Sequence, residues 1–279
     1  MLASNYHTHS RYCDGAGELQ SFIEQALRQG LASIGFSSHA PLPFATTWTM
    51  PLVRLPQYLA EIERLRIAYA PRLEVYAGLE LDFAPGVQHF QQEHILGLSF
   101  DYLIGSVHFL GFEPAHQPWT ADGPAPLFEQ GLREGYDGDI RRMVCEYYAR
   151  IRAMVLAGHI DVVGHLDRIL YNNPRDKYFT QEALWYREAV EETLQTIAAR
   201  DTLLELNAAG WFAPLGSPNP APWIVRRCRE LGIRFTYGAD AHRPEHVARG
   251  LERAAQLLRE CGYGETWCLS VGQWTPCPL

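Results

Sequence analysis

The sequence is almost devoid of lysine: only Lys177 occurs in 279 residues, and arginine supplies the other basic side chains. Acidic residues outnumber basic ones by 32 to 24, which gives a formal net charge of −8. A chain with this balance is not expected to capture nucleic acid or an anionic membrane by broad electrostatic attraction. We therefore expect neither nucleic acid nor membrane as a partner.

Long apolar runs and a disulfide framework are also missing. No apolar run reaches the roughly 18 residues of a membrane-spanning helix, and the first ten residues do not resemble a secretory signal. The six cysteines are scattered without a CxxC pair, which favours reduced thiols over disulfides or a cysteine-based zinc site. These features predict a cytoplasmic protein.

Short apolar runs alternate with longer amphipathic stretches along the chain. The runs cover residues 2–6, 33–37, 73–79, 102–107, 160–164, 203–206 and 233–238. The helix-like stretches lie at 19–30, 55–70, 87–98, 138–157, 181–199, 222–231 and 245–261. This alternation predicts an α/β fold, a parallel sheet with crossover helices, in one domain over residues 1–279.

Two segments rich in proline and aromatic residues interrupt the alternation, near residues 40–53 and 110–136. Long irregular segments inside a compact domain are usually functional. Trp48 and Trp119 lie in these insertions. We expect both insertions to cover an active site.

Polar side chains occur where the apolar runs end. They are His7, His9, His39, Glu80, His108, His165, Asn207, Asp240 and His242. The carboxyl ends of the strands of a β/α barrel share one face, where active sites are built. A single histidine in such a place is more often a structural hydrogen-bonding group than a ligand. The joint pattern predicts one cluster drawn from all the strands.

The residue types indicate metal binding. In the HTH motif, His7 and His9 lie two residues apart on a strand, so both side chains point to the same side. The GADAH motif repeats this spacing with Asp240 and His242. Imidazole with carboxylate suits zinc, iron or manganese, and a set without thiolates argues against a closed structural zinc site. The pattern therefore predicts a catalytic metal site.

The motifs as a set resemble those of a known family. They are HTHSRYCDG, FSSHAPLPF, GLELDF, IGSVHFLG, GHLDRIL, LELNAAG and GADAHRP. In this order they resemble the polymerase and histidinol phosphatase (PHP) superfamily, and within it the histidinol-phosphate phosphatase branch. The resemblance implies a distorted seven-stranded (β/α)7 TIM-like barrel with two to three divalent metal ions. It also implies hydrolysis of a phosphate monoester, L-histidinol phosphate, in histidine biosynthesis.

The resemblance further implies which side chains hold the ions. The first ion would have four ligands: His7, His9, Glu80 and Asp240. Glu80 would bridge to a second ion held by His108 and His165. A third ion would take His39, His242 and one ligand from an early loop. The family usually places that loop ligand where this sequence has Gly15, so Asp14 is our choice and Cys13 the alternative.

Charge counting supports a phosphate substrate. Three divalent ions would bring six positive charges, and Asp14, Glu80 and Asp240 would bring three negative ones. A phosphate dianion and a hydroxide between two ions would cancel the difference. The hydroxide would attack phosphorus in line, so no serine or cysteine nucleophile is needed. Glu80 and Asp240 would take part in catalysis by holding the ions.

Substrate contacts are expected beside the ligands. Arg168 and Arg243 follow ligand-bearing strand ends, and arginine suits bidentate recognition of phosphate. Arg168 is therefore a candidate both for catalysis and for substrate binding, and Arg243 and His159 are further substrate-binding candidates. Asp82 and Asp167 are candidates to receive an ammonium group.

Other functions remain open. A nucleotide phosphatase or exonuclease of the same superfamily would share the ligands. Binuclear amidohydrolases usually bridge their metals with a carboxylated lysine, and Lys177 lies in a polar loop, although mononuclear deaminases need no such lysine. A non-catalytic metal-binding barrel would be expected to lack ligands. The sequence indicates neither which metals are bound nor the oligomeric state.

Overall fold

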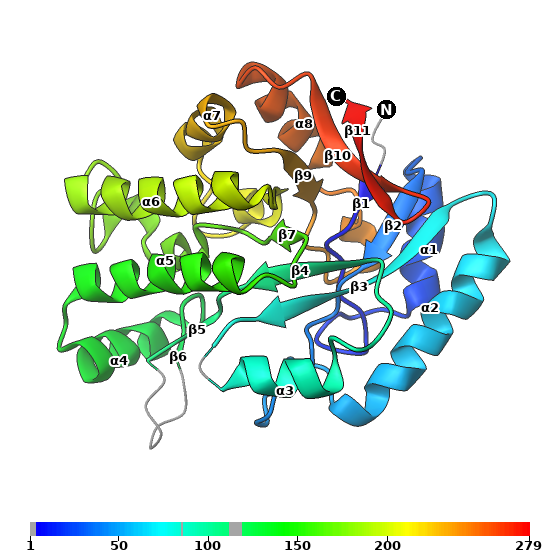
Figure 1. The fold of residues 1–279 in the computed structure, drawn as a ribbon, viewed down its shortest axis with the longest axis horizontal. Helices are drawn as coiled ribbons and strands as arrows, with labels where there is room; N and C mark the ends of the chain where they lie inside the picture. Colours follow the sequence, from blue (N-terminus) through cyan, green and yellow to red (C-terminus); the bar gives the residue numbers. More distant parts are fainter. Residues whose placement is uncertain (1–3, 85, 112–118) are drawn as a thin grey trace.

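The computed structural model describes residues 4–84, 86–111 and 119–279, and its central element is a seven-stranded sheet (Figure 1). In spatial order the strands are β1 Ser4–Asn5, β2 Ser33–Phe36, β3 Glu74–Asp82, β4 Tyr102–Ser106, β7 Val162–Val163, β8 Leu203–Asn207 and β9 Phe235–Gly238. Every neighbouring pair is parallel. This order confirms the predicted α/β class with its parallel sheet.

The two edges of the sheet meet just beyond the first and last strands. Thr8 and Ala241 form a parallel bridge. The His9 amide donates to the Ala241 carbonyl at 2.9 Å, and the Ala241 amide donates to the His7 carbonyl at 3.1 Å. The sheet is therefore a nearly closed, distorted barrel, as expected, and its closing seam consists of the HTH and GADAH segments.

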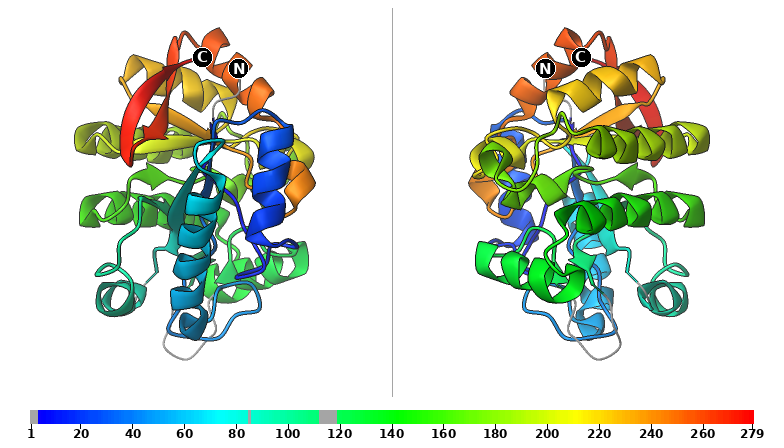
Figure 2. Two further views of the ribbon diagram at one scale, coloured as in Figure 1. Left: turned by 90° about the vertical axis from the view of Figure 1, so that its right-hand side faces the viewer. Right: turned by 90° about the vertical axis from the view of Figure 1, so that its left-hand side faces the viewer.

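Helices surround the barrel in the connections between strands (Figure 2). They are α1 Leu19–Arg28, α2 Leu55–Tyr69, α3 Val87–His94, α5 Ile140–Ala157, α6 Leu184–Arg200, α7 Pro222–Glu230 and α8 Leu251–Glu260. Outward side chains of the strands, such as Val75, Ala77 and Leu79, join them in the main hydrophobic core. Among the described residues, no helix is both long enough and apolar enough to cross a bilayer.

The predicted elements are present, with shifted boundaries. The helix expected at 87–98 ends at His94, and the one expected at 181–199 begins at Leu184. The stretch 245–261 divides into a 3-10 turn, Pro244–His246, and α8, because Gly250 before α8 has a left-handed φ of 79°. The run 2–6 yields only β1, and residues 2 and 3 lie outside the described residues.

The insertion near 110–136 contains structure that the sequence reasoning missed. Its start pairs β5 Phe109–Leu110 with β6 Trp119–Thr120, and it ends in α4 Ala125–Tyr136. Residues 112–118 between the two strands lie outside the described residues. The prolines of this segment suggested a loop, but Pro124 and Pro126 stand at the first turn of α4, where proline is well tolerated. The insertion near 40–53 is irregular up to a 3-10 turn at Leu52–Arg54.

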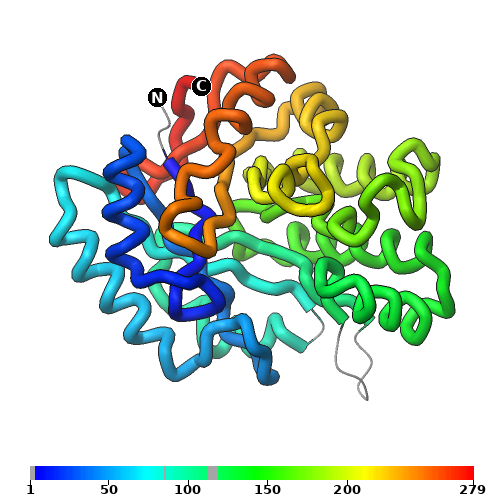
Figure 3. The backbone as a smooth tube through the Cα atoms, turned by 180° about the vertical axis from the view of Figure 1, so that it is seen from behind, coloured from blue at the N-terminus to red at the C-terminus, as the bar shows by residue number. Residues whose placement is uncertain are grey.

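A C-terminal hairpin, also missed, closes the amino-terminal end of the barrel. It pairs β10 Glu265–Ser270 with β11 Gln273–Pro278 and lies beside β1 (Figure 3). Ser4 Oγ of β1 donates to Cys268 Sγ at 3.4 Å. Inside this end of the barrel, three tyrosines and three aliphatic side chains pack in one cluster with Cys268 and Leu269 of the hairpin: Tyr6, Tyr76, Tyr102, Ile104, Val162 and Leu203. The opposite end is left for polar chemistry.

Close packing of Tyr102 in the barrel interior leads to a stability prediction. A Cβ atom at Gly78 would lie 2.4 Å from Cζ of the buried Tyr102 ring, whose hydroxyl donates to the Tyr6 carbonyl. We expect Gly78→Ala to lower the free energy of unfolding by about 1 to 3 kcal/mol, measured by denaturant titration. Gly264→Ala is the matched control, because a Cβ there meets no atom within 4 Å. Equal midpoints for the two variants would contradict the packing argument.

Candidate metal centre

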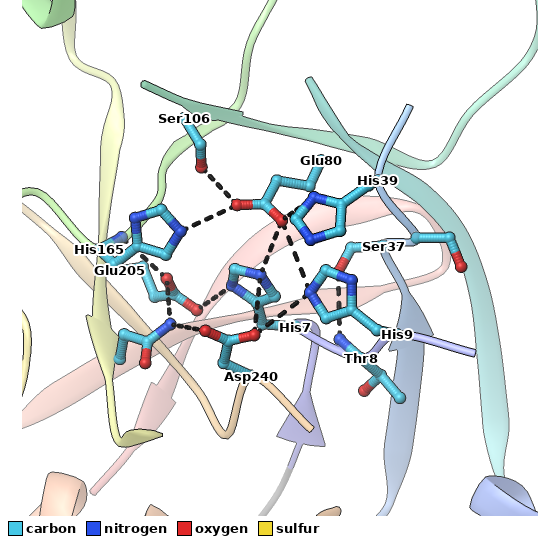
Figure 4. A network of polar contacts seen from close by, with 12 residues as sticks. His7, Thr8, His9, Ser37, His39, Glu80, Ser106, His165, Glu205 and Asp240 are labelled. Atoms are coloured by element: carbon cyan, nitrogen blue, oxygen red, sulfur yellow. Dashed lines mark hydrogen bonds and ion pairs between the residues drawn. The ribbon is translucent and has the colours of Figure 1, made fainter. Parts of the chain in front are cut away.

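The strands deliver polar side chains to the barrel interior because side chains alternate along a strand. In β3, Tyr76, Gly78, Glu80 and Asp82 face inward, while Val75, Ala77 and Leu79 join the helical core. The predicted ligands converge at the carboxyl end (Figure 4), and His7, His9, His39, Glu80, His108 and His165 are each at most 7% exposed. The predicted cluster therefore forms.

Each histidine nitrogen of the HTH motif lies at a distance from two carboxylate oxygens that suits ligands of one metal ion. His7 Nε2 lies 3.4 Å from Glu80 Oε2 and 3.6 Å from Asp240 Oδ1. His9 Nε2 lies 3.5 Å and 3.2 Å from the same two oxygens. Tetrahedral ligands about 2.1 Å from a zinc ion would be separated by roughly 3.4 Å. His7, His9 and Asp240 therefore have ligand atoms close enough to share one divalent ion, and Glu80 Oε2 lies beside both of these histidines.

Three of these atoms are also buried without a hydrogen bond. Within the described residues, His7 Nε2, His9 Nε2 and Glu80 Oε2 have no hydrogen-bond partner. Buried polar atoms are normally satisfied, because an unsatisfied one costs free energy. A metal ion would supply the missing interaction for all three at once.

The two oxygens of Glu80 face different histidines. Oε2 faces His7, His9 and His39, whose Nδ1 lies 3.0 Å away. Oε1 lies 2.9 Å from His165 Nε2 and 3.6 Å from His108 Nε2. Ser106 donates a hydrogen bond to Oε1 at 2.6 Å. This arrangement suits a carboxylate that bridges two ions.

Four sets of side chains within the described residues have ligand atoms close enough to share an ion. They are His7, His9 and Asp240; His7, Glu80 and His165; His39, Glu80 and His108; and His9, Asp14, His39 and His242. The first contains three of the four ligands implied for the first ion, without Glu80, and the last contains the three implied for the third ion together with His9. His108 and His165 fall into different sets, each with Glu80, rather than into one set with each other.

Asp14 lies at the edge of the cluster. Its Oδ2 is 3.4 Å from His242 Nε2, and its Oδ1 is 3.9 Å from His9 Nδ1 and from His39 Nε2. Cys13 Sγ lies 3.6 Å from His9 Nδ1, but burial and the Asp14 charge raise the pKa of this thiol to about 11. A protonated thiol is a poor ligand. Among the described residues, Asp14 shares a set of closely spaced ligand atoms with His9, His39 and His242 and Cys13 belongs to no such set, so the geometry favours Asp14.

The charges of the cluster support metal binding. Burial opposes ionisation of Glu80, but His39, His7 and His108 hold the pKa of this carboxyl well below its ordinary value. Asp240 likewise has a lowered pKa despite its burial, because of His7 and His9. Burial and the neighbouring His242 and His39 lower the pKa of His9 to about 3. At neutral pH both carboxylates are ionised and His9 is neutral, which are the forms that bind metal. Despite burial, the neighbouring carboxylates raise the pKa of His7 well above its ordinary value and those of His108 and His242 to about 10 and 9, so these rings would release a proton on binding an ion.

Two further carboxylates orient the histidines. Glu205 Oε1 lies 2.6 Å from His7 Nδ1, and its Oε2 accepts from the His165 amide at 3.0 Å. Asp82 Oδ1 lies 2.9 Å from His108 Nδ1. A metal-ligating histidine commonly bonds a carboxylate through its second nitrogen, which fixes the ring orientation. Sequence reasoning missed Glu205, although an acid inside the apolar run LLELN was a usable signal.

Asp82 and Asp167 are therefore not available to receive a substrate ammonium group, contrary to expectation. Asp82 is 3% exposed and committed to His108. Asp167 is fully buried, accepts hydrogen bonds from Asn219 Nδ2 at 2.6 Å and from the Ala221 amide at 2.8 Å, and does not line the cavity above the cluster.

A cavity of about 1380 Å³ opens above the cluster and is lined by both insertions. Trp48 places its ring 4.6 Å from that of His39 and 5.5 Å from that of His108. Trp119 packs on the glycine face of α4, where a Cβ at Gly131 or Gly135 would lie 2.7 or 2.6 Å from the indole. Both tryptophans line the cavity, as predicted for covering segments.

The structure brings Arg168 to the cavity but not Arg243 or His159. Arg168 Nη1 lies 3.8 Å from Asp240 Oδ2. Arg243 is 64% exposed, lies 4.0 Å from Glu245 and does not line the cavity. His159 is exposed and precedes β7, so it lies at the opposite end of the barrel from His165, which follows the strand. The expected substrate roles of Arg243 and His159 are therefore corrected.

The fold and this cluster define a class, the β/α barrels with a candidate metal centre at the carboxyl ends of their strands. The PHP domain family model matches residues 5–209. A Deinococcus radiodurans protein named "Probable histidinol-phosphatase" is 34% identical over 263 residues, covering 92% of each chain. The histidinol-phosphatase of Bacillus subtilis is 27% identical, covering 90% of this chain and 98% of the relative. The chain belongs to the PHP domain family.

A solved structure shares the fold over the whole chain. It is the histidinol phosphate phosphatase of Lactococcus lactis in complex with zinc, L-histidinol and phosphate. The TM-score is 0.78 at 22% sequence identity, and the match covers 98% of each chain.

Glu205 provides a test of the metal centre that does not depend on activity. We expect Glu205→Gln to weaken metal binding by about 10- to 100-fold, because the carboxylate that orients His7 and His165 is lost. Competition with a chromogenic chelator measures the affinity. Glu182→Gln is the control, since that side chain is 78% exposed and pairs only with Arg187. Equal affinities for the two variants would rule out this role for Glu205.

Proposed function

We propose that this protein is a metal-dependent phosphomonoester hydrolase whose substrate is L-histidinol phosphate. The observation that carries the proposal is the position of Glu80, whose two oxygens face separate groups of histidines beneath a cavity that contains Arg168. The names of the relatives and the ligands of the Lactococcus lactis structure support this choice of substrate.

The proposed cofactor is two to three divalent ions of zinc, iron or manganese. Nine side chains would hold them: His7, His9, Asp14, His39, Glu80, His108, His165, Asp240 and His242. When bound, the ions supply Lewis-acid chemistry, lowering the pKa of water and neutralising charge on the phosphoryl group.

The protein's own side chains would hold and orient the substrate. Arg168 donates to the phosphate oxygens, and arginine is suited to this because its nitrogens form a planar fork. Asp240 is held by Asn207, whose Nδ2 donates to Oδ2 at 3.3 Å. Trp48, packed against His39 and His108, limits access of water to the ligands from the cavity side.

Several features favour this function over its alternatives. A nucleotide phosphatase or exonuclease would use the same ligands, but the net charge of −8 and a cavity walled by two insertions favour a small substrate over a polyanion. Glu134 adds negative charge to the cavity wall, which favours an ester carrying an amine. Lys177 pairs with Glu129 at 2.6 Å and does not line the cavity, so it cannot bridge metals as in binuclear amidohydrolases.

Metal content is the first test. We expect two to three ions per chain by elemental analysis after growth with zinc, iron and manganese, because nine candidate ligands converge. The paired variant His7→Ala/His9→Ala should lose at least one of them. Less than one ion per chain in the unaltered protein would refute the metal centre, and a non-catalytic barrel would then become the better account.

The bridging position of Glu80 gives a second test. Glu80→Gln should lower kcat/KM at least about 100-fold, since Glu80 faces both groups of histidines. Asp14→Asn should cost roughly tenfold, because Asp14 is 31% exposed at the edge of the cluster. Both changes remove one carboxylate charge, so each serves as the control for the other. Equal losses in steady-state assays would show that Glu80 does not bridge.

Substrate choice is tested by steady-state kinetics with L-histidinol phosphate, a nucleoside monophosphate and a single-stranded oligonucleotide. We expect kcat/KM for histidinol phosphate to exceed the other two by about 100-fold or more, because an acidic protein disfavours the oligonucleotide polyanion and Glu134 in the cavity wall favours an ester carrying an amine over a nucleoside monophosphate. A higher value for either nucleotide substrate would refute this substrate assignment and leave the metal centre intact.

A further inference from the structure

The insertion that carries β5 and β6 is anchored at the metal centre. His108 directly precedes β5, and the Ala121 amide, just after β6, donates to the His108 carbonyl at 2.7 Å. On its other side this turn is held by Asn172, whose Nδ2 donates to the carbonyls of Ala121 at 3.3 Å and Gly123 at 2.9 Å. The residue between these two anchor points is Asp122.

Asp122 forms an ion pair with Arg168. Arg168 Nε donates to Asp122 Oδ2 at 2.7 Å, and the two side chains are only 19% and 15% exposed. Burial would raise the pKa of Asp122, but Arg168 and His108 hold it below its ordinary value. The carboxylate is therefore charged, and partial burial protects the pair from screening by water.

The contact with Asp122 is made by Nε of the Arg168 guanidinium group, and Nη1 points elsewhere. With Nε bonded to Asp122, Nη1 lies on the side of Asp240, 3.8 Å from Oδ2 and beyond hydrogen-bond distance. The bond at Nε restricts the orientation of the planar guanidinium group and keeps Nη1 on the side of the metal centre. Asp122 lines the cavity, contacts Arg168 through Oδ2 and belongs to no set of candidate ligands among the described residues.

We propose that Asp122 is a positioning residue, which holds Arg168 so that its terminal nitrogens face the phosphate group of the monoester. This inference rests on the proposed function, since it requires a phosphate at the metal centre. Asp122 acts through Arg168 and touches no reacting atom. The insertion thereby contributes to phosphate binding as well as to the wall of the cavity.

The first experiment compares Asp122→Asn with the unaltered holoenzyme, using inorganic phosphate as a competitive inhibitor. We expect the inhibition constant for phosphate and the KM for histidinol phosphate to rise roughly tenfold, because a charged hydrogen bond is lost. The value of kcat should fall less than KM rises. Asp122→Glu should recover part of the loss, since it restores the charge.

Controls separate this role from a structural one. Metal content and melting temperature of Asp122→Asn should equal those of the unaltered protein. Asp137→Asn removes the same charge at the end of α4, where Asp137 is 92% exposed, and should leave both constants unchanged. Loss of metal or a fall in melting temperature large enough to explain the kinetics would overturn the proposal.

A double-mutant cycle gives the decisive result. Arg168→Gln alone should weaken phosphate inhibition by more than Asp122→Asn does, and Asp122→Asn should then add no further loss in the Arg168→Gln background. An additive tenfold loss there would overturn the positioning role while the phosphatase function stands. Failure of the unaltered holoenzyme to hydrolyse any phosphate monoester would instead overturn the proposed function itself.

Discussion

The structure depends on one buried carboxylate. Glu80 is 1% exposed and is surrounded by imidazoles from four different strand ends. A buried charge without compensation is costly, so the cluster requires positive partners at this point, whether histidines alone or histidines with ions. The barrel supplies them because its carboxyl ends converge on one face (Figure 4). The same convergence places Glu80 Oε2 beside His7, His9 and His39. It places Glu80 Oε1 beside His108 and His165.

Other polar groups hold the histidines of this centre in place. Glu205 and Asp82 bond the second nitrogens of His7 and His108, and Gly238 leaves the space for Glu205, since a Cβ there would lie 2.1 Å from Oε1. At the other end of the barrel, tyrosines and the C-terminal hairpin form an apolar plug. The candidate metal ligands thereby lie at one end of the barrel, and the apolar side chains that stabilise it lie at the other, a division that β/α barrels commonly show.

The two insertions form walls of the cavity above the candidate metal ligands. Both line the cavity, and each brings a tryptophan that is fixed by packing rather than left in a flexible loop, Trp48 on the ligand histidines and Trp119 on the glycine face of α4. The turn after β6 is anchored to His108 and Asn172. Loops held this firmly on a rigid scaffold can select a substrate without a large conformational change.

The sequence by itself determined the strand and helix alternation and most of the candidate ligands. Alternation with period two put His7 and His9 on one side, and the position of Glu80, His165 and Asp240 at strand ends implied one face. Only the tertiary structure decided that Arg168 reaches the cavity while Arg243 and His159 do not, because sequence position near a strand does not fix where a loop directs its side chains. It also decided the contact of His7 with Glu205, 198 residues away, since no local pattern encodes which distant side chains a closed barrel brings together.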